Sequence, residues 1–337
     1  MSKTLTSHSS SGPAAAPRFA QRLGEGFAEP PCFLGIDGGG TKTHAVITTA
    51  SYKIIGEGFS GASNPVRVGF DLAVAHIGEA VEQACEQAHL APQDLAAGCA
   101  AIAGISHPIH YHTMKKGLVR RLGIDHLELV TDARAALEGA LDGKPGVVLI
   151  AGTGSIAMGI NEARAVERSG GWGPTLGDEG SGYDIARQAL KAVAASFDGR
   201  APRTVLTERL CRRFGITSAK DLPGVIYNND AEESTEIASL ARLVADAAAE
   251  GDAVARAILA QAGRDLSELA VSVIRKLGFE SQTFRVAFVG SVFKAGDCVL
   301  DPLRKAVREI APRAEVGPPL RPPEIGAIKL AQAAVEN

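Results

Sequence analysis

Two stretches of the sequence have the same form, Leu34–Ile47 (LGIDGGGTKTHAVI) and Val148–Ile160 (VLIAGTGSIAMGI). Each is an apolar run, then a glycine turn that carries a threonine, then a second apolar run. Residues 43–49 (THAVITT) are rich in β-branched types, which favour a strand over a helix. We therefore predict a β-hairpin with its turn at Gly38–Lys42. The repeated form predicts a chain made of two related halves.

The first turn differs from the two common phosphate-binding loops. A Walker A loop has Gly-Lys-Ser/Thr at the start of a helix, whereas here Thr41 separates Gly40 from Lys42 and a strand follows. A Rossmann fingerprint also opens a helix, and its third glycine would fall at Thr43. Neither interpretation fits this sequence.

A glycine hairpin has its own means of holding an anion, because glycine accepts φ > 0 and successive N–H groups can then face a phosphate. Thr41 adds a hydroxyl donor and Lys42 a positive charge. Asp37 stands where it could hold Mg²⁺ through water. The turn Gly152–Ser155 offers a second set of donors. The alternative for the first turn is an ordinary glycine hairpin with a solvated lysine.

The bulk properties limit the class of protein. The chain has 337 residues, a net charge of −3 and 22% charged residues, which gives no indication of binding to nucleic acid or a membrane surface. No apolar run approaches the ~20 residues that a membrane-spanning helix needs. The five cysteines are scattered and lack C-x-x-C spacing, so we expect neither a disulfide framework nor a zinc or iron–sulfur site. A reducing cytoplasm fits best.

The order of elements predicts an α/β protein with a tail and two domains. Residues 1–30 are rich in Ser, Ala and Pro, and we interpret them as a disordered tail or a misassigned start. The first domain is predicted at 31–142 and the second at 143–337, with a helical insertion at about 200–280. The expected strands are Lys53–Phe59, Ala97–Ala103, Leu127–Thr131, Val147–Ala151 and Phe284–Val289. The expected helices are Asp71–His89, Ala133–Leu141, Tyr183–Ser196, Asp252–Leu277 and Ile325–Val335, and Pro312–Pro323 is expected to be a proline-rich connector.

Asp132 is the candidate catalytic residue, since it lies at the carboxyl end of a predicted strand. Ligands gather at such strand ends in α/β sheets, and a carboxylate there can accept a proton from an attacking hydroxyl. The alternative is that Asp132 caps the helix that follows.

Six of the thirteen residues in the segment Gly170–Gly182 are glycines, and the segment also contains the one tryptophan of the chain, Trp172. The apolar ring of Trp172 could stack on a sugar face. Asp178 could accept hydrogen bonds from ligand hydroxyls, or it could be an acid in the first turn of the next helix. Weaker candidates are Asn64, which is also typical of a turn, and Gly290-Ser291, which could pack against a base or ribose. We expect residues 107–112 (HPIHYH) to form an exposed loop.

These segments resemble the N-acetylglucosamine kinase group of the BadF/BadG/BcrA/BcrD-type ATPase family, within the actin-like, ribonuclease-H-fold superfamily. They occur in family order from residue 33 to about residue 330. The glycine-rich segment around Trp172 is the most specific of them. The matching pieces are residues 37–43 (DGGGTKT), 131–132 (TD), 152–155 (GTGS), 170–173 (GGWG), 177–180 (GDEG) and 290–291 (GS).

The resemblance implies two ribonuclease H-like domains, with ATP and a sugar in the cleft between them. It implies that Thr41 and Thr153 contact the ATP phosphates and that Asp132 is the base at the sugar hydroxyl. The full set of predicted nucleotide-binding residues is Asp37, Gly39, Gly40, Thr41, Lys42, Gly152, Thr153, Gly154, Gly290 and Ser291. The implied sugar-binding residues are Asn64, Asp132, Ser155, Gly171, Trp172, Gly173 and Asp178.

The sequence departs from the eukaryotic members of this group at one position. Those proteins carry Asn directly after the Gly-Thr-Gly-Ser turn, where this chain has Ile156. A possible amide contact to the sugar is lost. The departure leaves N-acetylglucosamine, glucosamine, another amino sugar or a different hexose open as the substrate.

The activity expected from this resemblance is transfer of the γ-phosphoryl group from Mg·ATP to a hydroxyl, O6, of an amino sugar. We expect a cytoplasmic homodimer whose partners are small molecules, with no nucleic acid and no membrane. One alternative is an ATPase activator of an acyl-CoA dehydratase or reductase, but its iron–sulfur cluster needs closely placed cysteines. Another is a sugar sensor without catalytic activity, although no helix-turn-helix or basic face supports it.

Overall fold

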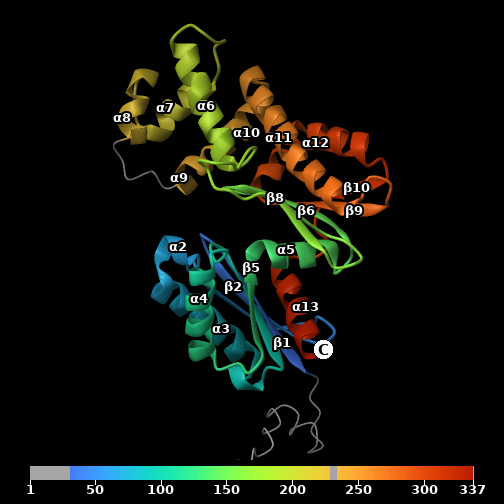
Figure 1. Cartoon of the computed structure of the whole chain (residues 1–337). Coiled ribbons are helices and arrows are strands. Elements are labelled where there is room, and N and C mark those ends of the chain that lie inside the picture. The colour runs from blue at the N-terminus through green and yellow to red at the C-terminus, as the bar shows by residue number, and fades with distance from the viewer. Residues whose placement is uncertain (1–30, 228–233, 337) are drawn as a thin grey trace, which may run out of the picture.

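The computed structural model describes residues 31–227 and 234–336. Two five-stranded sheets, each with its own helices, make up this part of the chain (Figure 1). The predicted tail at residues 1–30 lies outside the described residues. None of the helices in the described ranges is both long and apolar enough to cross a membrane.

The first sheet begins with the predicted hairpin. Its strands are β1 (Cys32–Gly38), β2 (Thr43–Thr49), β3 (Ile54–Ser60), β4 (Ala97–Ile102) and β5 (Leu127–Thr131), in the order β3-β2-β1-β4-β5. β1 to β3 pair antiparallel, whereas β4 and β5 run parallel to β1. Helices α3 (Phe70–Ala88) and α4 (Pro108–Leu122) supply apolar side chains to one core cluster of this sheet.

The second sheet repeats this topology. Its strands are β6 (Gly146–Ala151), β7 (Ser155–Ile160), β8 (Val166–Gly170), β9 (Phe284–Val289) and β10 (Ala314–Gly317), in the order β10-β9-β6-β7-β8. β6 to β8 are again antiparallel, and β9 and β10 are again parallel to the first strand of the half. The prediction of two α/β halves of the ribonuclease H type is therefore confirmed.

The helical region of the second half lies between β8 and β9. It contains α6 (Gly182–Phe197), α7 (Leu206–Phe214), α8 (Leu222–Tyr227), α9 (Ser234–Ser239), α10 (Ala241–Ala249) and α11 (Ala253–Leu277). Asp252 caps the long helix α11 by accepting a hydrogen bond from Ala255 N–H at 2.8 Å, and Gly278 ends it at φ +69°. These helices and the second sheet share the largest core cluster.

The two halves exchange their closing helices. α5 (Asp132–Leu141), which ends the first half, packs Leu137, Ala140 and Leu141 against Val148 of the second sheet. α13 (Pro323–Glu336), which ends the chain, packs on the first sheet. Figure 1 shows this red helix beside the blue strand β1. The predicted second domain, residues 143–337, includes α13, and we now propose a first domain of residues 31–142 together with α13.

Glycines allow α5 and α13 to cross closely. A Cβ at Gly326 of α13 would lie 2.0 Å from the carbonyl oxygen of Ala135. A Cβ at Gly139 of α5 would lie 2.5 Å from the carbonyl oxygen of Pro322. Real Cβ atoms do not approach oxygen this closely, so the crossing requires glycine on both helices.

Two local predictions were wrong. Residues 107–112 are not an exposed loop, because His107 caps α4 and Pro108 is the first residue of that helix. The ring Nδ1 of His110 lies 3.1 Å from the carbonyl oxygen of Gly104. The proline-rich segment 312–323 also contains the short strand β10, which follows α12 (Asp297–Ile310) and adds an edge to the second sheet.

Candidate active site

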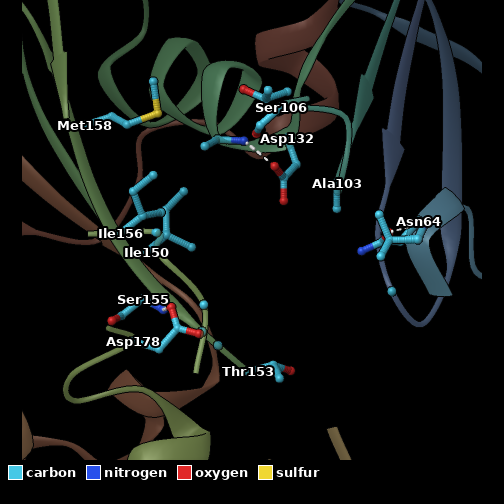
Figure 2. A pocket seen from close by; sticks show the side chains of 18 of the residues that line it. Asn64, Ala103, Ser106, Asp132, Ile150, Thr153, Ser155, Ile156, Met158 and Asp178 are labelled. Atoms are coloured by element: carbon cyan, nitrogen blue, oxygen red, sulfur yellow. Dashed lines mark hydrogen bonds between the residues drawn. The ribbon is translucent and has the colours of Figure 1, made fainter. Parts of the chain in front are cut away.

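A cavity of about 720 Å³ lies between the two halves, and its lining comes from both. Figure 2 shows Asn64 and Ala103 on one side, the isoleucine pair Ile150 and Ile156 on the other, and Asp132 above the space between them. The lining includes ten of the residues predicted from sequence: Gly40, Asn64, Asp132, Gly152, Thr153, Gly154, Ser155, Gly171, Gly173 and Asp178.

The first glycine turn is held by backbone and by one arginine. Gly39 N–H donates to the carbonyl of Lys42 at 3.0 Å, and the carbonyl of Gly39 accepts from Asn64 N–H at 3.1 Å. Arg67 donates through Nη1 to the carbonyl of Gly40 at 2.9 Å. Arg67 lines the cavity, whereas Thr41 and Lys42 are exposed outside the lining that the described residues form.

The second glycine turn is held by the start of α6. Gly152 N–H donates to the carbonyl of Gly154 at 2.9 Å, which closes the turn. Gly182 N–H, at the head of α6, donates to the carbonyl of Gly152 at 2.8 Å. Thr153 is exposed and its side chain borders the cavity in Figure 2. The turn therefore presents Thr153 from a backbone that a helix fixes in place.

Asp132 is not the cap of α5. The cap is Thr131, whose Oγ1 accepts from Arg134 N–H at 3.3 Å, and Asp132 is the first residue of the helix. Asp132 Oδ1 accepts from Ala133 N–H at 2.9 Å, and the other carboxylate oxygen points into the cavity in Figure 2. The geometry thus leaves one oxygen of this carboxylate for a ligand.

The surroundings of Asp132 make it a better proton acceptor. The Asp132 side chain is exposed to the cavity, yet atoms of both halves lie around the carboxyl group there, and this desolvation raises the pKa of the carboxyl above its ordinary value. Hydrogen bonds from the backbone, including that from Ala133 N–H, lower the pKa and only partly offset the effect. A carboxylate with a raised pKa holds an accepted proton more readily.

Asp37 lies at the base of the first turn, near two other acids. Desolvation by burial, then the charges of Glu324 and Asp132, raise the pKa of Asp37 to about 6, against the opposing effects of Lys42 and His44. Glu324 stands in the first turn of α13 and its Oε1 lies 3.1 Å from Nδ1 of His44. A cation near Asp37 would relieve this repulsion. Within the described ranges, no group of three or more His, Cys, Asp or Glu side chains could hold a metal ion.

Asp178 is a buried acid with an unusual backbone. Its φ is +62°, a left-handed conformation that is uncommon outside glycine and that is often found at binding sites. Its Oδ1 accepts from Ser155 N–H at 3.1 Å. Burial raises the pKa of Asp178, a hydrogen bond from Ser155 N–H lowers it, and Glu179 raises it. Ser181 caps α6, so Asp178 precedes the helix and is not an acid of its first turn.

The position of Asp178 depends on glycine in the second turn. A Cβ at Gly154 would lie 2.7 Å from Oδ2 of Asp178. The hydroxyl of Ser155, which was predicted to contact the sugar, donates to the carbonyl of Glu179 at 2.8 Å. The two glycine-rich segments therefore pack directly on each other beside the cavity.

Asn64 both shapes a turn and borders the cavity. Its Oδ1 accepts from Val66 N–H at 3.0 Å and so caps the short helix α2 (Pro65–Val68). Its side-chain nitrogen points toward the cavity in Figure 2. The two interpretations of this residue are therefore compatible.

The glycine-rich loop after β8 brings only part of its predicted residues to the cavity. Gly171 and Gly173 have φ of +72° and +83° and belong to the lining. Trp172 is 63% exposed and lies outside the lining, with the guanidinium of Arg168 5.1 Å from its ring centroid. Arg168 itself lines the cavity. Arg168 and Arg67 are not among the residues predicted from the sequence, since neither belongs to a recognised motif.

Gly290 and Ser291 are exposed and lie outside the cavity lining that the described residues form. Gly290 has φ +121°, and a Cβ there would lie 2.1 Å from the carbonyl oxygen of Ala151. The missing side chain lets the end of β9 pack against the end of β6, beside the second glycine turn. A contact with adenosine stays a prediction.

Comparison with known proteins identifies the family. Residues 34–331 match the BadF/BadG/BcrA/BcrD ATPase family, and the chain belongs to it. The chain is 32% identical to an N-acetylmuramic acid/N-acetylglucosamine kinase from Clostridium acetobutylicum, over 89% of this chain and 98% of that protein. It is 33% identical to an N-acetyl-D-glucosamine kinase from Dictyostelium discoideum, over 89% of this chain and 97% of that protein.

Solved structures agree with the fold. A candidate N-acetylglucosamine kinase from Chromobacterium violaceum superimposes with a TM-score of 0.74 at 27% identity, over 89% of this chain and 99% of that chain. A ROK family glucokinase from Streptomyces griseus, in complex with glucose and AMPPNP, superimposes with a TM-score of 0.58 at 19% identity, over 90% of this chain and 99% of that chain. The second likeness bears on the fold alone.

Proposed function

We propose that this protein transfers the γ-phosphoryl group of ATP to O6 of an amino sugar such as N-acetylglucosamine or glucosamine. The chain is an ATP-dependent carbohydrate kinase of the amino-sugar class, as its family and curated relatives indicate. A third relative is a glucosamine kinase from Vibrio cholerae, 27% identical over 77% of this chain and 84% of that protein. The choice of O6 and of the particular sugar is our proposal.

The observation that carries the proposal is the position of Asp132 in a cavity bordered by both glycine turns. In the proposed reaction, Asp132 accepts the proton of the sugar hydroxyl while that oxygen attacks the γ-phosphorus. The bond from the γ-phosphorus to the β–γ bridging oxygen breaks, and ADP leaves with that oxygen. Such transfers depend mainly on positioning and on stabilisation of charge. The raised pKa of Asp132 suits the role of proton acceptor.

We propose that the two turns hold the phosphates from opposite sides. Thr153 would donate through its hydroxyl from the second turn, and Thr41 from the first. Arg67 adds a positive charge beside Gly40 within the cavity lining, where the sequence analysis had expected Lys42 to supply it. A guanidinium with a fixed position suits phosphate oxygens better than a mobile ammonium group does.

We also propose that Mg²⁺ accompanies the ATP. Asp37 offers a carboxylate oxygen, the ligand type that Mg²⁺ prefers, in a place where neighbouring acids favour a cation. A hydrated ion held by one carboxylate needs no larger cluster of acids. Bound Mg²⁺ would neutralise charge on the phosphates. The expected homodimer stays a prediction, which light scattering after size-exclusion chromatography would test.

The proposed function is tested by ADP release. Purified protein is assayed with N-acetylglucosamine, glucosamine, N-acetylmannosamine, glucose and no sugar, and the 6-deoxy form of the best substrate is then compared. We expect release of ADP that depends on an amino sugar and that is lost with the 6-deoxy compound. Turnover of the 6-deoxy sugar would contradict O6 as the acceptor, and ADP release that no sugar stimulates would contradict the kinase assignment.

Asp132→Asn tests the catalytic residue. We expect kcat to fall at least ~100-fold with a modest change in sugar KM, because the variant keeps shape but loses the proton acceptor. Asp125→Asn is the matched control, since Asp125 is an exposed acid of the same half outside the cavity. Near-normal turnover of Asp132→Asn would remove this residue from the mechanism.

A further inference from the structure

The loop that follows β4 brings a hydroxyl group to the cavity that no sequence motif indicated. β4 and β5 are parallel neighbours, and Ile102 at the end of β4 is the register partner of Thr131, the residue before Asp132. The chain that continues from β4 therefore starts beside Asp132, at the carboxyl edge of the first sheet. Ala103 and Ser106 of this loop line the cavity. Figure 2 shows Ser106 at the end of the cavity where Asp132 lies.

The backbone of this loop is held in place by hydrogen bonds and by packing. Ala103 N–H donates to the carbonyl of Gly38 at 2.8 Å, which ties the loop to the first glycine turn. The ring Nδ1 of His110 lies 3.1 Å from the carbonyl oxygen of Gly104. The side chain of Ile105 is buried in the core of the first half. The serine that follows therefore extends from a fixed position, as a side chain that binds a substrate must.

The hydroxyl of Ser106 is available to a ligand. Its side chain is exposed, and no group in the described ranges forms a hydrogen bond with the hydroxyl. Ser155 differs, because its hydroxyl donates to the carbonyl of Glu179. A serine hydroxyl donates one hydrogen bond and accepts others, as a sugar hydroxyl does. In Figure 2, Ser106 lies at the opposite end of the cavity from Thr153, which favours a contact with the sugar over one with the phosphates.

We propose that Ser106 binds O4 of the sugar and thereby selects the configuration at C4. The inference rests on the proposed function, in which O6 faces Asp132. C4 and C6 of a hexose are both bonded to C5, so O4 is the hydroxyl nearest to O6 along the carbon chain. A hydroxyl group beside Asp132 therefore meets O4. O4 is equatorial in the gluco configuration and axial in the galacto configuration, and a fixed partner pairs with one of these positions and leaves the other unpaired.

The test removes the hydroxyl from the protein and from the sugar in turn. With the full-length protein, kcat/KM is measured for the best amino-sugar substrate and for its 4-deoxy and 3-deoxy analogues. We expect the wild type to use the 4-deoxy analogue with a kcat/KM about tenfold lower. Ser106→Ala should lower kcat/KM for the parent sugar about tenfold and for the 3-deoxy analogue similarly, but for the 4-deoxy analogue less than about twofold, because the partner hydroxyl is already gone.

Further variants separate recognition of O4 from general damage to the cavity. Ser106→Thr keeps the hydroxyl and should recover part of the loss. Ser51→Ala is the matched control, since Ser51 is an exposed serine of the same half outside the cavity lining, and it should leave all three values unchanged. Thermal melting of each variant checks the fold. If turnover of the 4-deoxy analogue is too slow to measure, its inhibition constant against the parent sugar takes the place of kcat/KM.

The preference between C4 epimers gives a second measurement. The wild type should favour the gluco sugar over its 4-epimer, and the ratio of the two kcat/KM values should fall about tenfold in Ser106→Ala. A ratio that stays the same in this variant would contradict the role of Ser106 in selecting the configuration.

The outcomes distinguish this inference from the proposed function. An equal loss with the parent sugar and the 4-deoxy analogue in Ser106→Ala overturns the inference and leaves the kinase assignment intact, as does a variant with unchanged kinetics. A loss that disappears with the 3-deoxy analogue instead also overturns it, because the serine would then bind O3. Failure to phosphorylate any amino sugar overturns the proposed function, and this inference with it.

Discussion

The two glycine turns have the same sequence form but are supported differently. The first turn carries Arg67 against the carbonyl of Gly40, so a side chain from α2 brings its charge. At the second turn, Gly182 N–H at the head of α6 instead donates to the carbonyl of Gly152. The N-terminus of a helix carries partial positive charge, so the backbone at the start of α6 provides a positive potential beside the second turn. The two turns have the same topology, and each lies near positive charge. In the first turn the charge comes from an arginine side chain, and in the second it comes from the N-terminus of a helix.

The acids beside the turns differ as well. β1 carries Asp37 one residue before its last, with raised pKa, whereas β6 ends in the buried alanine Ala151. The acid of the second turn is instead Asp178, which comes from a distant loop and packs on Gly154. From this comparison we propose that the first turn binds the ATP phosphates and Mg²⁺, while the second turn also helps to hold the sugar. The following predictions test this division.

Among variants of the two turns and their neighbouring residues, the largest effect is expected at Gly154. In Gly154→Ala the new Cβ would lie 2.7 Å from Oδ2 of Asp178, so either the turn or the acid must move. We expect kcat/KM for the sugar to fall about 100-fold, since small misplacements in a positioned site are costly. Gly152→Ala is the matched comparison, because its Cβ meets nothing within 4 Å, and it should lose much less. Equal losses in steady-state assays of the two variants would contradict the packing argument.

Asp37→Asn is expected to make the fold more stable and the enzyme less active. The pKa of Asp37 is about 6 in the folded protein and 3.8 in the unfolded chain, so ionisation of Asp37 lowers the free energy of unfolding. This destabilisation is absent below pH 3.8 and reaches its full size above pH 6. We expect the variant to be more stable at pH 7.5, by at most about 3 kcal/mol before solvent screening reduces the gain, and to show no gain near pH 4. Urea denaturation at both pH values measures this.

The same variant should require more Mg²⁺ for half-maximal activity, because the proposed carboxylate ligand of the hydrated ion is gone. A magnesium titration of kinase activity tests this part. An unchanged requirement for Mg²⁺, together with the stability gain, would mean that Asp37 is a strained acid with no role in holding the ion.

A smaller effect is expected at Arg67. Arg67→Ala removes both the hydrogen bond to the carbonyl of Gly40 and a positive charge in the cavity. We expect the KM for ATP to rise about tenfold with little change in sugar KM, consistent with the loss of one charged contact. Lys42→Ala is the comparison variant and should have the weaker effect, since Lys42 is exposed outside the lining. The reverse ranking would restore lysine as the phosphate-facing cation.

Local patterns were enough to predict the hairpins, the helices α3, α5, α6, α11 and α13, and the strand end before Asp132, but not the helices α4 and α12. The missed helix start at His107 could have been found, because proline at the first helical position is a known signal. β10 has four residues between prolines and shows no usable alternation. Arg67 and Arg168 lie at the cavity because of tertiary packing, which local sequence patterns do not show. The periodicity of apolar residues predicts that α13 is a helix, but it does not predict which sheet the helix covers.

The exchange of closing helices has a consequence for how the protein is made. One face of the first sheet is covered mainly by α13 (Pro323–Glu336), together with Ala135 of α5. Because α13 follows the whole second sheet in the sequence, this face keeps apolar surface uncovered during synthesis until α13 has been made. Deleting α13 would accordingly damage the half of the protein that is made first.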